Sequence, residues 1–133
     1  MTDFLHPMMD EHALRQCSAL ALAHMGDSVY ELMTRGWLIA SGLVTSRNLH
    51  RETIRLVCAG AQAAGAHVIQ PMLTEEEQAV FKRGRNANVH AIPQHASRAQ
   101  YQKATALEAL LGWLYLNGRR ERINELFKIM MEE

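Results

Sequence analysis

The chain has 133 residues, 48% of them hydrophobic, and its 14 basic and 14 acidic side chains give a formal net charge of zero. That length suggests one domain, spanning residues 1–133, which can bury a core without disulfides or a structural metal. The neutral charge excludes a globally basic nucleic-acid-binding protein, so any polyanion site must be a local patch.

Residues 1–10 have no periodic pattern and are expected to form a loose leader. From about residue 11 to residue 41, apolar residues recur at helical spacing, which predicts one long helix with Gly42 just past its end. The apolar residues that carry this pattern are Leu22, Met25, Val29, Leu32 and Ile39. A second helix is predicted over residues 46–57, capped by Thr45 or Ser46, and a third over residues 59–70.

The second half of the chain is also predicted to be helical. Thr74 and Glu77 form a capping-box pattern that opens a short helix to about residue 83. Residues 84–97 have no period, and irregular stretches of about this length are often functional. Ser97 is expected to cap a long helix to about residue 116, and a last helix is predicted over residues 120–131. With no strand pattern, the sequence predicts an all-α protein of six to seven helices.

Cellular location can be judged from three absences in the sequence. No segment approaches the roughly 20 apolar residues of a membrane span, and no signal peptide opens the chain. Cys17 and Cys58 form no CxxC motif or disulfide framework, which favours a reducing compartment and indicates two small core residues. We therefore expect a cytoplasmic protein without a membrane partner.

Two carboxylates stand in the most apolar helical segments. Asp27 follows Gly26, and Glu108 is flanked by alanines and leucines with no basic residue one helical turn away. Buried acids are rare unless they are paired, metal-bound or functional. Asp27 could therefore be ion-paired with an arginine such as Arg35 or Arg55, or the two acids could share a divalent cation, because Mg²⁺ typically takes one or two carboxylates.

A cluster of cations precedes the irregular stretch. Lys82, Arg83 and Arg85 lie around Gly84, and Asn86 follows them. Arginine can bind a phosphate in a bidentate fashion, and Gly84 would let a ligand approach the backbone. The alternative is a solvated helix C-terminus, where cations offset the helix dipole. We favour phosphate contact, with Arg98 extending the cluster across the irregular stretch.

Three motifs in order resemble the Mini-ribonuclease III family, whose members are ribonuclease III-like proteins without a separate double-stranded-RNA-binding domain. They are ALAHMGDSVYE at residues 21–31, KRGRNA at residues 82–87 and ATALEALLGWLY at residues 104–115. The resemblance runs over residues 17–130. It implies the all-α ribonuclease III catalytic fold, a homodimer, and a valley along the dimer that accepts double-stranded RNA.

The resemblance also implies an activity and a site. Family members are endoribonucleases that use Mg²⁺, with Mn²⁺ able to substitute, and they leave 5′-phosphate and 3′-hydroxyl ends. Their usual role is the maturation of the ends of 23S ribosomal RNA precursor. By matching motifs, Asp27 and Glu108 are the catalytic and metal-binding residues. Lys82, Arg83, Arg85, Asn86 and Arg98 are then the candidate RNA-binding residues.

The chain departs from full-length ribonuclease III at three acidic positions, which here hold Leu20, Ala23 and Thr105. Mini-ribonuclease III shares these losses, and fewer protein ligands would leave more metal positions to water and phosphate. Gly60 stands where the family often has lysine. Two alternatives to an endoribonuclease are a non-catalytic RNA-binding or ribosome-associated module on the same fold, and a helical interaction protein whose acids are merely ion-paired.

Overall fold

The computed structural model describes residues 3–87 and 97–132, and over these residues it is all helical, as the sequence predicts. Most of the irregular stretch predicted over residues 84–97 lies outside the described residues. In chain order the elements are α1 (Glu11–Gln16), α2 (Ala19–Ala40), α3 (Ser46–Val57), α4 (Ala59–Ile69), the 3-10 turn η1 (Gln70–Met72), α5 (Glu75–Arg85), α6 (Arg98–Leu116) and α7 (Arg120–Glu132).

The single helix predicted over residues 11–41 is wrong, because the chain breaks between α1 and α2 at Cys17 and Ser18. The Ser18 hydroxyl accepts a hydrogen bond from the Ala21 amide, 3.0 Å away, and so caps α2. A serine at this position satisfies a free amide that a continuous helix would not have. Asp10 caps α1 in the same way through the Ala13 amide. The apolar period alone runs through this break and conceals it.

Most of the other predicted helix ends are confirmed, but α5 continues past the predicted end at residue 83 to Arg85, and Thr45 precedes α3 without a capping side-chain hydrogen bond. Thr74 and Ser97 each form a capping box, with Glu77 and Gln100 as the reciprocal partners. Gly42 and Gly118 follow α2 and α6 with φ of 106° and 73°, the left-handed conformation that glycine adopts without strain.

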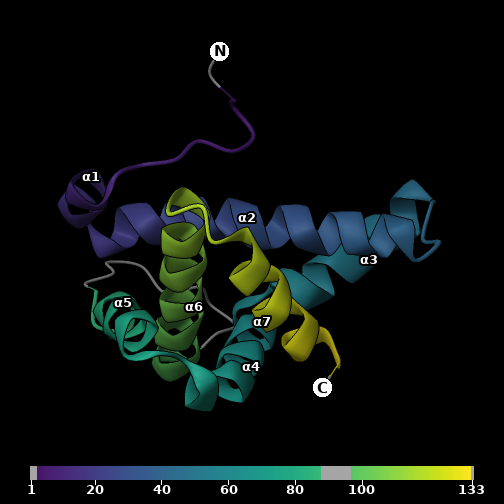
Figure 1. The fold of residues 1–133 in the computed structure, drawn as a ribbon. Helices are drawn as coiled ribbons and strands as arrows, with labels where there is room; N and C mark the ends of the chain where they lie inside the picture. The colour runs from purple at the N-terminus through teal and green to yellow at the C-terminus, as the bar shows by residue number, and fades with distance from the viewer. Residues whose placement is uncertain (1–2, 88–96, 133) are drawn as a thin grey trace.

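Helix α6 is the centre of the molecule, and in Figure 1 it runs across the long helix α2. It packs against α2 on one side and against α4 and α5 on others. Every residue from Ala104 to Leu114 is buried except Glu108, which is half-buried. A helix buried nearly all round is a core helix. Glu108 is therefore the one position in this run where α6 reaches solvent.

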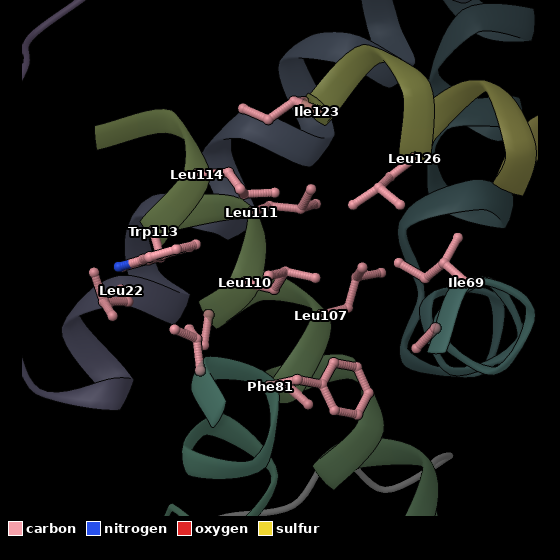
Figure 2. Close-up of a cluster of buried hydrophobic side chains, with 14 of the residues drawn as sticks. Leu22, Ile69, Phe81, Leu107, Leu110, Leu111, Trp113, Leu114, Ile123 and Leu126 are labelled. Carbon is pink, nitrogen blue, oxygen red and sulfur yellow. The ribbon is translucent and has the colours of Figure 1, made fainter. Parts of the chain in front are cut away.

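The core surrounds α6, and Figure 2 shows its leucines between α2, α4, α5 and α7. Leu107, Leu110, Leu111 and Leu114 are fully buried there. The predicted apolar face of α2 is only partly buried, since Leu32 and Ile39 are 65% and 49% exposed. Leu32 lines a surface hollow together with Tyr115 of α6 and Ile123 of α7.

A buried ion pair joins α5 to α7. Glu77 is 2% exposed, and its carboxylate accepts two hydrogen bonds from the Arg122 guanidinium, at 2.8 and 2.9 Å. Burial alone would raise the pKa of Glu77, but hydrogen bonds from Arg122 and from the Thr74 amide hold it below its usual value. Glu77 therefore caps its own helix and anchors α7.

Two further expectations concern location. Within the described residues, no helix is both long enough and apolar enough to cross a membrane. Cys17 is half-buried and packs against the hydrophobic core, whereas Cys58 is exposed, so the prediction of a core residue is wrong for Cys58. Both cysteines lie at helix boundaries, Cys17 after α1 and Cys58 before α4.

Candidate functional site

The two acids meet where α2 crosses α6. A β-carbon built on Gly26 would overlap the backbone carbonyl of Glu108, and one on Gly112 would overlap the carbonyl of Leu22. The two helices are thus in backbone contact, which only glycine permits. Asp27 is the residue next to Gly26, and its carboxylate lies close enough to that of Glu108 to raise the Glu108 pKa.

The two carboxylates differ in their exposure. Asp27 is exposed, whereas Glu108 is half-buried among apolar residues. Burial, together with the neighbouring carboxylate of Asp27, raises the pKa of Glu108 to about 8, while the amide of Gln62 acts in the opposite direction. A buried acid whose pKa is raised beside a second carboxylate is typical of functional sites.

The ion-pair alternative for Asp27 is wrong. Arg35 binds Glu31 at 3.4 Å and Arg55 binds Glu52 at 2.7 Å. Among residues 3–87 and 97–132, no cationic side chain lies within 4.0 Å of Asp27 or of Glu108. The negative charge of the pair is therefore balanced by no protein cation that the structure describes.

A hydrated divalent cation fits this pair. Mg²⁺ binds one or two carboxylates and keeps most of its waters, so two adjacent acids facing solvent suffice. The positions that are acidic in full-length ribonuclease III supply no ligand, because Leu20 and Ala23 are apolar and the Thr105 hydroxyl donates to the Tyr101 carbonyl at 2.9 Å. Consistently, the described residues contain no cluster of three or more acids, histidines or cysteines.

The cations predicted to bind phosphate do not lie on one face. Lys82 and Arg85 line the same surface hollow as His67. Arg83 lies in a different hollow with Glu11 and donates to the Cys17 carbonyl at 3.1 Å, where α1 ends. The structure therefore brings Lys82 and Arg85 together and separates Arg83 from them.

The remaining candidates lie at the two ends of the stretch 88–96. Asn86 is the C-cap residue of α5, and Arg98 is the exposed first residue of α6. The interpretation of Gly84 as a point of ligand approach is wrong. A β-carbon there would lie 2.8 Å from the β-carbon of Ala109, so Gly84 serves the packing of α5 on α6.

Sequence reasoning missed Gln62, whose side chain is 2% exposed and lies beside Glu108. Its only sequence signal is a polar residue within the alanine-rich helix α4. At Gly60, in the same helix, a β-carbon would meet only the Gln100 amide nitrogen, at 3.7 Å. A longer side chain at position 60 is therefore sterically permitted.

Comparison with known proteins gives consistent matches. The model of the family described as "Ribonuclease III domain" matches residues 20–119. A Mini-ribonuclease 3 from Symbiobacterium thermophilum is 47% identical over 82% of this chain and 84% of its own length. A Mini-ribonuclease 3 from Clostridium tetani is 40% identical over 96% of this chain and 85% of its own. A crystal structure of a protein from Fusobacterium nucleatum superposes with a TM-score of 0.83 at 30% identity, covering 90% of this chain and 95% of that one.

Proposed function

Because this chain belongs to the ribonuclease III domain family, among the Mini-ribonuclease 3 proteins, and is an endoribonuclease of a family that acts on double-stranded RNA, we propose that it works with Mg²⁺ held by Asp27 and Glu108. The observation that carries this proposal is the pair of adjacent carboxylates without a protein cation at the crossing of α2 and α6.

The residues of the pair have distinct parts in the proposed reaction. Bound Mg²⁺ supplies a more acidic water and neutralises charge on a phosphoryl oxygen. Asp27 reaches solvent, so it can meet the cation together with the RNA phosphate. Glu108 is held by the packed part of α6 and fixes the position of the cation. Water attacks phosphorus, the bond from phosphorus to the 3′-oxygen breaks, and the products are a 5′-phosphate and a 3′-hydroxyl.

The RNA-binding surface that we propose includes Lys82, Arg85, Asn86 and Arg98. A-form RNA is recognised largely through its phosphates, its 2′-hydroxyls and its shape. Lys82 and Arg85 share a surface hollow, and Arg98 and Asn86 flank the stretch 88–96. Arg83 is the weakest member of the predicted set, because it already binds the carbonyl at the end of α1.

We propose that the active enzyme is a homodimer. Leu32, Trp37 and Ile39 expose apolar surface on the second half of α2, and Val44 follows in the next turn at 75% exposure. Exposed apolar surface of this kind often marks a protein interface, and zero net charge opposes association little. Sedimentation of the 15.0 kDa chain should give twice that mass. A monomer at micromolar concentration would contradict the dimer.

The biological substrate proposed is the 23S ribosomal RNA precursor, cleaved at its ends in the cytoplasm, and Mn²⁺ should replace Mg²⁺. This finer assignment comes from the family resemblance. The alternative of a non-catalytic RNA-binding module is disfavoured, because both acids are kept and lie together.

The deciding experiment uses purified protein and an end-labelled RNA duplex, with Mg²⁺, with Mn²⁺ and with EDTA. Cleavage in either metal and none in EDTA is expected. Duplex binding without cleavage in any metal would favour the non-catalytic module. A matched single strand is the control, and it should remain uncut.

A further inference from the structure

The side chain of Gln62 is buried at the start of α4, and its amide is only half satisfied. The Gln62 amide nitrogen donates to the Val57 carbonyl at 2.9 Å, which ties α4 to the end of α3. Its carbonyl oxygen Oε1 is buried and accepts no hydrogen bond from the described residues. Buried polar atoms without partners are uncommon, and each calls for an explanation.

Gln78 shows that the bond to the backbone does not require this burial. It holds the same place in α5 as Gln62 holds in α4, the fourth residue of the helix. It also donates to the carbonyl five residues earlier, Leu73, at 3.2 Å. Gln78 is nevertheless exposed, whereas Gln62 is 2% exposed. The local hydrogen bond therefore accounts for neither the burial of Gln62 nor its unpaired oxygen.

The feature that sets Gln62 apart from Gln78 is its position beside Glu108. An amide nitrogen carries two hydrogens, so Gln62 can bind the Val57 carbonyl with one and the Glu108 carboxylate with the other. The Gln62 amide lies close enough to the Glu108 carboxylate to lower its pKa, the effect expected of a donor that favours the ionised form. The Glu108 carboxylate thus has Gln62 of α4 and Asp27 of α2 as its polar neighbours.

We infer that Gln62 is a positioning residue for the cation site, holding the Glu108 carboxylate through its amide nitrogen and offering its buried carbonyl oxygen to water of the hydrated cation. This inference rests on the proposed function, because it assumes that Asp27 and Glu108 bind the cation. Partners that orient metal ligands are commonly worth about 10–100-fold in metal affinity. The acids absent at positions 20, 23 and 105 make such support more important here.

The test measures Mn²⁺ binding to the full chain without RNA, by electron paramagnetic resonance of free Mn²⁺. Gln62→Met keeps the length of the side chain and removes both polar groups. It should weaken Mn²⁺ binding about tenfold or more. Gln78→Met removes the matching backbone hydrogen bond in α5 and should leave Mn²⁺ binding unchanged. In cleavage assays, Gln62→Met should raise the Mg²⁺ concentration for half-maximal rate, with activity restored at high Mg²⁺.

A merely structural role predicts the opposite pattern. Gln62→Met would then lower the melting temperature and bind Mn²⁺ within twofold of the unmodified chain, which would overturn the inference. An equal loss of Mn²⁺ binding in Gln78→Met would also overturn it. If Gln62→Met loses helicity, Gln62→Asn repeats the test with a shorter amide that should also weaken binding. Mn²⁺ binding and cleavage that survive Asp27→Asn and Glu108→Gln would instead refute the proposed function itself.

Discussion

Gly26 of α2 lies directly against the backbone carbonyl of Glu108 in α6, with no room for a β-carbon between them. This contact of a glycine with the backbone of a catalytic candidate is what brings the carboxylates of Asp27 and Glu108 together. The packing of the core and the geometry of the site therefore depend on the same contact.

Gly26→Ala should be strongly destabilising, because the new methyl group would force α2 and α6 apart. A cost of at least about 2 kcal/mol in unfolding free energy is expected, as for other overpacked cores. Gly36→Ala is the matched control in the same helix, since nothing lies within 4 Å of a β-carbon there. It should stabilise the protein by about 0.5–1 kcal/mol, because glycine is a poor helix former. Urea unfolding followed by circular dichroism measures both.

Asp27→Asn and Glu108→Gln should each abolish cleavage of duplex RNA while the fold is kept. Each change removes one negative charge from the proposed cation site and alters little volume. Glu31→Gln is the control, because Glu31 binds Arg35 on the surface of α2 and should be dispensable for the chemistry. Single-turnover cleavage in Mg²⁺ is the measurement. Full activity in either of the first two variants would refute the assignment.

The raised pKa of Glu108 predicts how stability changes with pH in EDTA. Its pKa is about 8 in the folded chain and near 4.5 when unfolded, so the folded state holds this proton more tightly. The stabilisation is complete below about pH 4.5 and is lost as pH rises through about 8. Glu108→Gln should remove this loss, so the variant should melt above the unmodified chain at pH 9. The measurement is the difference in melting temperature between the two proteins at each pH from 5 to 9. The contribution of the seven histidines is common to both proteins and cancels in this difference.

Arg85→Ala should weaken binding to an RNA duplex. It should also reduce the slope of log affinity against log salt concentration by about one, the change expected for the loss of one phosphate contact. Arg85 lines the hollow that it shares with Lys82, where phosphate contact is proposed. Lys128→Ala removes a surface cation on α7 that interacts with Glu132, and it should leave the slope unchanged. Fluorescence anisotropy at several salt concentrations, without divalent cations, gives both slopes. An unaltered slope for Arg85→Ala would exclude the contact.

Arg122→Ala should destabilise the protein by about 3 kcal/mol, the lower end for a buried pair because Arg122 itself is partly exposed. The change leaves the Glu77 carboxylate buried without its cation. Arg15→Ala removes a pair with Glu11 that is exposed on both sides, and it should change stability by less than about 1 kcal/mol. Equal effects of the two variants in urea unfolding would show that the α5–α7 ion pair contributes little.

The sequence by itself determined the helices and most of their ends. Thr74, Ser97, Gly42 and Gly118 act through bonds and torsions within a few residues, so local reasoning finds them. Local reasoning did not predict the break before Ser18, because an apolar period can continue across a change in the direction of the chain. Asp27 and Glu108 were also singled out from the sequence, since acids are rare in apolar helices and both lie in family motifs.

Only the tertiary structure decided which of these residues meet. It placed Asp27 beside Glu108, paired Arg35 and Arg55 with other acids, turned Arg83 toward α1 and brought the buried amide of Gln62 to Glu108. These relationships join residues far apart in the chain, and they follow from how closely α2, α4 and α5 pack on α6. That closeness depends on single glycines such as Gly26, Gly84 and Gly112, whose partners lie on another helix and leave no trace in the local sequence pattern.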